Sequence, residues 1–351
     1  MSPLLISTRK GLFLSQAGQA PEPLAFIGDP VSLAYGNANS PWFAALNLGH
    51  FGTKMHRSDD QGKTWKEIAC PAFAEQSDDD APTVEMIWAL ERDRSNRMWA
   101  GTIPGALFYS DDEGESWHLV ASLWNVPERG EWFGGGADKP GIHSICIHPD
   151  NENRITIGIS CGGVWHSEDR GESWHLACEG MEAEYMPPEQ ANAQNIQDPH
   201  CIVQCRSNPD VLWCQHHNGI FKSNNRGHNW TRIYPEGPSD FGFPVAVHPK
   251  DANTAWFIPA KKDEHRYPVD GKVVVNKTQD GGDTFHTINE GLPDPAWDLV
   301  YRHALTIDDQ GDHLAFGSTT GSCCLSQDGG ESWQTLSANL PPIYGMRFVQ
   351  P

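Results

Sequence analysis

The sequence has no hydrophobic run long enough to cross a membrane, and basic residues are scarce beside acidic ones. No stretch reaches the roughly 18 consecutive apolar residues that a membrane-spanning helix needs. The 25 Lys and Arg stand against 46 Asp and Glu, which gives a formal net charge of −21. Proteins that bind nucleic acid or anionic lipid use lysine and arginine to pair with phosphate. This balance therefore argues against a general nucleic-acid binder and against a membrane-surface protein.

The sequence also lacks a cysteine framework and the apolar core of a secretory signal. Its nine cysteines are odd in number and follow no disulfide or zinc spacing, and Cys201 and Cys205 do not form a CxxC motif. Residues 1–15 carry Arg9 and Lys10 inside their only apolar run, unlike a signal peptide. We therefore expect reduced thiols and a cytoplasmic protein.

What the sequence has in abundance is an internal repeat. An eight-residue pattern begins with Ser or Thr, has Asp or Asn third and Gly fifth, and ends in an aromatic residue. The six copies are residues 58–65, 110–117, 167–174, 223–230, 278–285 and 326–333. Their starts lie 48 to 57 residues apart, the length of a four-stranded propeller blade with its loops.

The repeat has the chemistry of a turn between two strands. Its Asp can bond to the nearby backbone, its Gly can take a positive φ, and its Trp is buried as the next strand begins. Apolar segments precede each copy, for example residues 98–102 and 107–109 before the second one. These segments predict the second and third strands of a blade.

This pattern resembles the Asp-box, or bacterial neuraminidase repeat, Ser-x-Asp-x-Gly-x-Ser/Thr-Trp, over nearly the whole chain. Asn225 replaces the Asp of one copy and Phe285 the Trp of another, so we expect looser turns there. Residues 4–15 form a degenerate seventh copy without an inner strand, and residues 344–350 form a strand without a blade. We predict that residues 1–351 form one all-β domain, a seven-bladed β-propeller of four-stranded blades, closed by the C-terminal strand pairing into the first blade.

The long loops are expected to share one face of this propeller. Turns between second and third strands lie on the same face as the connections between blades, and the Asp-box turns lie on the other. The long connections on the first face are residues 70–83, 123–142, 179–199 and 260–272. Because long loops in compact domains are often functional, we expect the site at this mouth of the central channel.

Four side chains occupy matching positions, 23 to 25 residues before an Asp-box, at the starts of predicted inner strands. They are Glu85, His143, His200 and His303. Inner strands line the axis, so these side chains are expected to converge on the channel mouth. Three imidazoles and one carboxylate are typical ligands of a divalent metal ion such as Zn, Mn, Fe or Cu. The alternatives without a metal are a ring of polar residues around a wet channel, or histidines that act as ordinary acid–base groups.

Further polar residues are expected around the same mouth. The candidate catalytic residues are Tyr35, His50 and His217. The candidates for holding an anionic substrate are Arg9, Arg129, Arg266, Tyr267 and Arg302. The loop carboxylates that can act as acid or base are Glu128, Glu131, Asp138 and Glu184.

Three functions stay open. The first is an enzyme that acts on a small organic or carbohydrate substrate, with a bound metal and lyase or hydrolase chemistry. The resemblance to Asp-box proteins implies the second, a sialidase-like glycoside hydrolase, although the Arg-Ile-Pro motif of sialidases is missing and no arginine triad can be placed. A resemblance to photosystem II assembly-factor propellers implies the third, a non-catalytic protein-binding scaffold. The sequence leaves the oligomeric state open.

Overall fold

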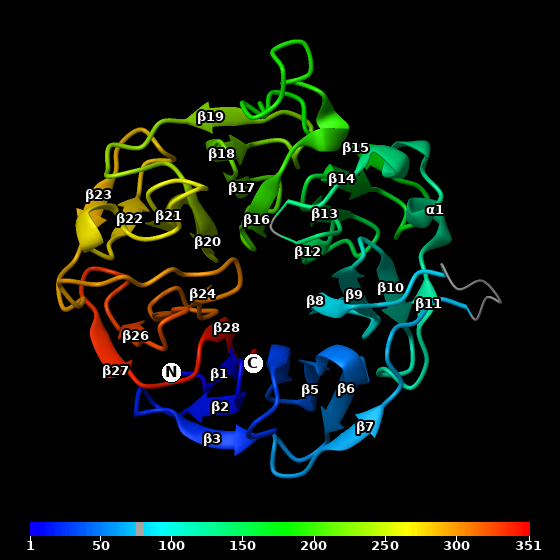
Figure 1. Ribbon diagram of the computed structural model, residues 1–351, viewed down its shortest axis with the longest axis horizontal. Helices are drawn as coiled ribbons and strands as arrows, with labels where there is room; N and C mark the ends of the chain where they lie inside the picture. The colour runs from blue at the N-terminus through cyan, green and yellow to red at the C-terminus, as the bar shows by residue number, and fades with distance from the viewer. Residues whose placement is uncertain (75–80, 136) are drawn as a thin grey trace.

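The structure, a computed structural model, describes residues 1–74, 81–135 and 137–351. Seven four-stranded antiparallel sheets stand as blades around a central axis (Figure 1). The chain passes once around the ring, so each blade follows the preceding one in sequence. The predicted seven-bladed propeller is therefore confirmed.

Each blade runs from an inner strand at the axis to an outer strand at the rim. The inner strands are β28 (Ile343–Phe348), β4 (Val31–Asn37), β8 (Met86–Arg92), β12 (Ile142–Ile147), β16 (Pro199–Gln204), β20 (Gly242–His248) and β24 (Leu305–Ile307). The second strands are β1 (Leu4–Thr8), β5 (Ser40–Asn47), β9 (Met98–Ile103), β13 (Ile155–Ile159), β17 (Leu212–His216), β21 (Asp251–Pro259) and β25 (Leu314–Gly317). The third strands are β2 (Gly11–Ser15), β6 (Thr53–Ser58), β10 (Leu107–Ser110), β14 (Gly163–Ser167), β18 (Gly219–Ser223), β22 (Val275–Thr278) and β26 (Cys323–Ser326). The outer strands are β3 (Glu22–Ala25), β7 (Lys66–Ile68), β11 (His118–Leu119), β15 (His175–Leu176), β19 (Thr231–Ile233), β23 (His286–Ile288) and β27 (Gln334–Ser337).

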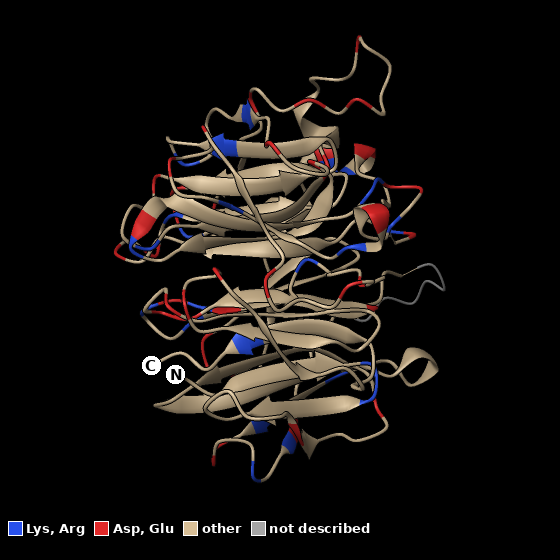
Figure 2. Cartoon of the chain, turned by 90° about the vertical axis from the view of Figure 1, so that its left-hand side faces the viewer, with Lys and Arg blue, Asp and Glu red and all other residues tan. Residues whose placement is uncertain are grey.

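The helices are short and lie in the connections. They are α1 (Ala121–Trp124) and the 3-10 turns η1 (Gly49–Phe51), η2 (Pro127–Glu131), η3 (Gln194–Ile196) and η4 (Val269–Gly271). No helix in the described ranges has the length and apolarity to cross a membrane. Charged residues concentrate in the loops and at strand ends, whereas the strands themselves are mostly uncharged (Figure 2).

The ring closes through the C-terminal strand. β28 pairs antiparallel with β1, with Leu4 opposite Phe348 and Thr8 opposite Ile343, and the two termini lie close together in Figure 1. The predicted closure by residues 344–350 is therefore confirmed. Since β28 supplies the inner strand of the first blade, closure leaves no blade without its full set of strands.

Neighbouring blades are held together by aromatic side chains of the second strands. Trp99 of β9, Trp213 of β17 and Trp256 of β21 are all fully buried. Trp99 belongs to a cluster with the isoleucines of the next blade, and Trp256 to one with the last blade. Burying a large apolar side chain contributes about 1.5–3 kcal/mol, so these contacts stabilise the ring as well as each sheet.

The Asp-box turns carry the hydrogen bonds that the repeat predicts. Asp169 accepts from the Ser173 backbone N–H at 2.9 Å and from the Ser167 hydroxyl at 2.8 Å. Asn225 accepts from the equivalent groups of Asn229 and Ser223 at 2.9 and 3.0 Å. The expectation of a looser turn at Asn225 is therefore wrong, because an amide oxygen accepts the same two bonds as a carboxylate oxygen.

The Asn225 turn leads to a prediction for the other boxes. Asp169→Ala removes the acceptor for three bonds at a strand connection, from the Ser167 hydroxyl and from the backbone N–H and hydroxyl of Ser173, and is expected to lower the free energy of unfolding by about 1–2 kcal/mol. Asp169→Asn keeps an acceptor oxygen and should lose less than half of that. Urea denaturation of the two variants and the parent measures the difference, and equal losses for Ala and Asn would contradict the assigned role of the oxygen.

Candidate functional site

The inner strands begin with a β-bulge in several blades. The register with the second strand shifts at Ser32 in β4, Trp88 in β8, His143 in β12 and His200 in β16. A bulge leaves the extra residue unpaired and redirects its side chain. These four bulge residues therefore occupy equivalent positions in their blades, near one end of the channel.

At this end lies a cavity of about 250 Å³, which we call the mouth pocket. Its lining residues come from the long loops and from the strand starts beneath them. They are Phe133, Gly134, Gly135, Cys161, Tyr185, Asp198, His200, His217, Phe243, Asp263, Arg266 and Arg302. Three of the four predicted long loops contribute to this pocket. In the fourth, residues 70–83, positions 75–80 lie outside the described residues.

One side of the mouth pocket is a cluster of one carboxylate and two imidazoles. Oδ2 of Asp198 lies 3.4 Å from Nε2 of His200 and 3.4 Å from Nδ1 of His217. The other ring nitrogen of His200, Nδ1, lies 2.7 Å from the Gly242 carbonyl oxygen and donates to it. We call Asp198, His200 and His217 the Asp–His–His cluster.

The carboxyl group of Asp198 is buried but ionised. Burial alone would raise its pKa, yet the charges and hydrogen bonds of His200, His217 and Arg302 hold the pKa well below its usual range. The backbone N–H of Cys161 also donates to Oδ1 at 3.1 Å. Cys161 has a φ of 47°, a left-handed conformation that is unfavourable for a residue with a side chain and is typical of functional sites.

On the other side of the pocket lies the guanidinium of Arg302. The residue is 8% exposed, and its Cζ lies 4.8 Å from the Trp88 ring centre and 5.4 Å from that of Phe243. Within the described part of the chain, its Nε has no hydrogen-bond partner. Asp198 is the main opposing charge on this guanidinium, and its buried Nε is a donor without an acceptor. A buried donor without a partner is costly, so this group can receive an anionic group of a ligand.

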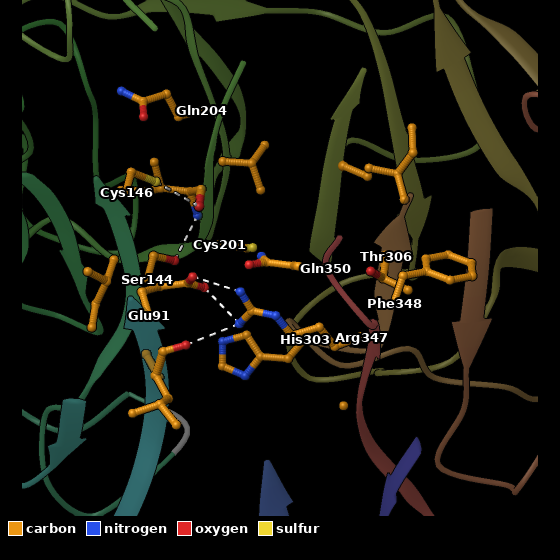
Figure 3. A pocket seen from close by; sticks show the side chains of 18 of the residues that line it. Glu91, Ser144, Cys146, Cys201, Gln204, His303, Thr306, Arg347, Phe348 and Gln350 are labelled. Atoms are coloured by element: carbon orange, nitrogen blue, oxygen red, sulfur yellow. Dashed lines mark hydrogen bonds and ion pairs between the residues drawn. The ribbon is translucent and has the colours of Figure 1, made fainter. Parts of the chain in front are cut away.

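Below the mouth, the inner strands surround a channel of about 590 Å³ (Figure 3). Arg347 of β28 pairs with Glu91 of β8 here through two bonds of 2.9 and 2.7 Å. His303 lies beside this pair in Figure 3, and its Nε2 is 2.7 Å from the His143 carbonyl oxygen. Arg302 lines both the channel and the mouth pocket.

The predicted metal ligands Glu85, His143, His200 and His303 are not brought together as a ligand set in the described structure. Glu85 is exposed and pairs with Lys139 at 2.6 Å. His143 and His303 line the channel, whereas His200 lines the mouth pocket. The similar spacing from the Asp-boxes gave a wrong position for Glu85, because Trp88 occupies the bulge position in that blade.

Of the predicted catalytic residues, His217 lies in the mouth pocket, and Tyr35 and His50 lie elsewhere. Tyr35 is near the far end of β4, where its hydroxyl bonds to Gln350 at 3.1 Å. Counting 23 residues back from the Asp-box at Ser58 ends at Tyr35 and does not reach the bulge at Ser32. The count falls short because β5 has eight residues, whereas β13 has five. His50 is an exposed residue of η1, and neither Tyr35 nor His50 is among the residues that line the mouth pocket.

The predicted anion-binding residues separate in the same way. Arg302 and Arg266 line the mouth pocket. Tyr267 is not among the lining residues and packs against Trp297, with ring centres 5.6 Å apart. Arg9 is exposed on the β1–β2 turn. Arg129 stacks on Trp124 at 3.2 Å from its ring centre, outside the pocket. Two arginines at the described pocket do not make the triad that sialidases use.

Sequence reasoning missed Asp198, although a signal for it exists. Asp198 stands two residues before His200, and residues two apart in an extended chain face the same side. His217 follows β17, the strand that pairs with β16. The Asp–His–His cluster therefore comes from a single blade, whereas the prediction searched for equivalent positions in different blades.

Comparison with known proteins places the chain among Asp-box propellers. Residues 56–67 and 108–119 match the BNR/Asp-box repeat family. The chain is similar to the oligoxyloglucan-reducing end-specific xyloglucanase of Emericella nidulans, at 21% identity over 266 residues, which are 71% of this chain and 26% of that protein. The chain therefore spans about a quarter of the length of this curated relative.

Solved structures agree on the architecture. A GH74 enzyme from Niastella koreensis superposes with a TM-score of 0.58 at 14% identity, covering 97% of this chain and 65% of that one. YCF48 from Cyanidioschyzon merolae superposes with a TM-score of 0.55 at 13% identity, covering 88% and 86%. At these identities the likeness concerns the fold. The chain is therefore a seven-bladed β-propeller that carries BNR/Asp-box repeats.

Proposed function

We propose that the chain is a hydrolase that acts in the mouth pocket on a carbohydrate substrate with an anionic group. The observation that carries the proposal is that the Asp–His–His cluster and the guanidinium of Arg302, whose Nε has no hydrogen-bond partner among the described residues, line one cavity of about 250 Å³. The cluster supplies groups that activate water, and the guanidinium supplies a counter-charge. The similarity to a xyloglucanase favours hydrolysis of a carbohydrate over elimination.

Aromatic side chains around the pocket support a sugar-like substrate. Phe133 and Tyr185 line the cavity. Trp297, 60% exposed, packs against Tyr267, which follows the lining residue Arg266 in sequence. Aromatic rings of this kind present an apolar face together with polar edges. Such faces pack against the apolar side of a pyranose ring, while its hydroxyl groups stay free for hydrogen bonds.

The two arginines of the pocket support an anionic group on that substrate. Arg266 and Arg302 lie on Phe243, each with Cζ 5.4 Å from its ring centre. Arg266 already donates to Asp263, whereas no ion pair of Arg302 is found among the residues with described positions. A planar guanidinium binds a carboxylate through two parallel hydrogen bonds, so a sugar acid fits better than a neutral sugar.

The carboxylates of the pocket argue for activated water rather than a two-carboxylate glycosidase mechanism. That mechanism needs one protonated carboxyl group to donate to the leaving group. Asp198 is held ionised, and Asp263 is bonded to Arg266. Neither of these lining carboxylates is prepared as the donor. The Asp–His–His cluster is therefore assigned both steps: an imidazole takes a proton from the attacking water and passes it to the departing glycosidic oxygen.

Fluorogenic 4-methylumbelliferyl glycosides test the proposal in matched acidic and neutral pairs, such as glucuronide with glucoside and galacturonide with galactoside. We expect turnover of an acidic member, and Arg302→Met should lower its kcat/KM by about 10²-fold because two charge-assisted bonds are lost. The neutral partner should change less than about threefold. Arg9→Met, at an exposed position outside the pocket, is the matched control and should behave as the parent.

Two outcomes would overturn the proposed function. One is the absence of hydrolysis across acidic and neutral glycosides and their oligosaccharides. The other is an acidic substrate whose turnover is insensitive to Arg302→Met. The protein-binding alternative draws on the exposed aromatic Phe51, 78% exposed on the loop face, and isolation of one stoichiometric protein partner from an inactive preparation would favour it.

A further inference from the structure

We propose that Asp198, His200 and His217 bind one divalent metal ion of the zinc type at the side of the mouth pocket. The inference deepens the proposed function at the same site, because a bound metal would activate the attacking water. Metal binding is nevertheless measurable without any substrate. The two proposals can therefore fail separately.

The spacing of the cluster fits ligands that share an ion. The two nitrogen–oxygen distances to Oδ2 of Asp198 are both 3.4 Å, and the three ligand atoms lie within 4.8 Å of one another. A charge-assisted N–H···O bond is about 2.7–2.9 Å long, so 3.4 Å is long for direct hydrogen bonds. Tetrahedral coordination at about 2.0–2.1 Å separates ligand atoms by about 3.3–3.4 Å.

The hydrogen bond made by His200 points to the same conclusion. Nδ1 of His200 donates to the Gly242 carbonyl, which leaves the lone pair of Nε2 directed toward the carboxylate of Asp198 in the neutral ring. A lone pair facing a carboxylate is repulsive, and a cation held between the two atoms removes the repulsion. Metal-bound histidines usually donate their other N–H to a carbonyl or carboxylate in this way.

The donor set and its surroundings suit a catalytic rather than a purely structural ion. Two imidazoles and one carboxylate are a ligand set of hydrolytic zinc enzymes, which keep a fourth position open. The mouth pocket borders the cluster and offers room for water or substrate at that position. When bound, such an ion lowers the pKa of its water to about 7.

A second histidine cluster on the chain is a weaker candidate. His166, Glu168 and His228 also bring three ligand atoms within 4.8 Å. However, Glu168 pairs with Arg154 at 3.2 Å and with Arg226 at 2.9 Å. These two guanidinium groups neutralise the carboxylate and repel a cation. In the Asp–His–His cluster, by contrast, the described side chains nearest to Oδ2 of Asp198 are its two fellow ligands, and Arg302 acts on Asp198 through its charge without a direct ion pair among the described residues.

The test is Zn²⁺ titration of the full chain after treatment with a chelator and dialysis. Calorimetry should show one tight site per chain in the parent. His217→Ala and Asp198→Asn should each weaken that site by at least about 10²-fold, which exceeds the loss of a group that only orients a ligand. His228→Ala, which removes a ligand of the second cluster, is the matched control and should keep the tight site.

Co²⁺ in place of Zn²⁺ adds a spectroscopic measurement. A site of two imidazoles, one carboxylate and one water should give the intense visible absorption of tetrahedral Co²⁺, and His217→Ala should abolish it. Thermal melts of the metal-free proteins establish that each variant is folded. For Asp198→Asn the side-chain shape is kept, so that variant isolates the charge.

Three results would overturn the metal site. They are the absence of saturable Zn²⁺ binding, a tight site that survives His217→Ala and Asp198→Asn, and a tight site lost in His228→Ala. Hydrolysis that persists in metal-free protein would refute a catalytic metal and leave the hydrolase proposal standing. Tight binding to the cluster without turnover of any glycoside would leave the metal site standing and remove the hydrolase.

Discussion

Ending the chain at Pro342 is expected to leave no cooperatively folded propeller. The deletion removes β28 and with it four buried side chains, Ile343, Met346, Phe348 and Val349. At about 1.5–3 kcal/mol for each fully buried large apolar side chain, the loss is about 6–12 kcal/mol. A domain is typically stable by only about 5–15 kcal/mol. The deletion also exposes the edge of β1, which invites aggregation.

Circular dichroism melts and analytical gel filtration measure this effect. Removal of Pro351 alone, an exposed residue, is the control and should leave the melting temperature unchanged. If the truncated chain is insoluble, the loss of stability can still be measured with Ile343→Ala in the full chain. Its side chain is fully buried, so the free energy of unfolding should fall by about 2–5 kcal/mol. A truncated chain that melts cooperatively near the parent temperature would show that β28 does not hold the ring closed.

The architecture could be predicted from the sequence because the repeat encodes it locally. Each Asp-box fixes one turn through a few adjacent residues, and the same bonds recur at Asp112, Asp169 and Asp328. Six copies at regular spacing then fix the number of complete blades. The closing strand also followed from the sequence, since residues 344–350 were a strand for which no other blade had room.

The positions at the channel mouth could not be predicted as well, because they depend on strand and loop lengths. Counting back from an Asp-box assumes that every blade has strands of one length. β5 is three residues longer than β13, so the same count that finds His143 and His200 places Tyr35 instead of Ser32. In the third blade a count of 25 residues finds Glu85, whereas the bulge residue is Trp88. The position of a bulge depends on how two strands pair, so it cannot be predicted from a short sequence motif.

The Asp–His–His cluster was missed for a different reason. Its residues come from one blade, and His217 reaches Asp198 because β16 and β17 are paired. The prediction assumed that a functional site would follow the pseudosymmetry of the ring. Asp198 itself has no equivalent in the repeat pattern. Departures from the repeat are therefore better guides to the site of this propeller than the repeated positions are.

Asp198→Asn is expected to lower kcat/KM about 10³-fold on the acidic glycoside that the parent hydrolyses. The amide keeps the shape of the side chain and its bond from the Cys161 N–H. It removes the negative charge that faces His200 and His217 at 3.4 Å, and with it the means to polarise water or to hold a cation. Losing an activating group of this kind typically costs 10²- to 10⁴-fold.

Glu85→Gln is the matched control, because it makes the same change of carboxylate to amide at a position outside the pocket. Glu85 was the carboxylate that the sequence predicted at the site, and the structure shows it exposed and paired with Lys139. Its kcat/KM should stay within about twofold of the parent, since an exposed ion pair contributes at most about 1 kcal/mol. Equal losses for Asp198→Asn and Glu85→Gln, or retention of more than a tenth of the activity in Asp198→Asn, would move the catalytic centre away from the cluster.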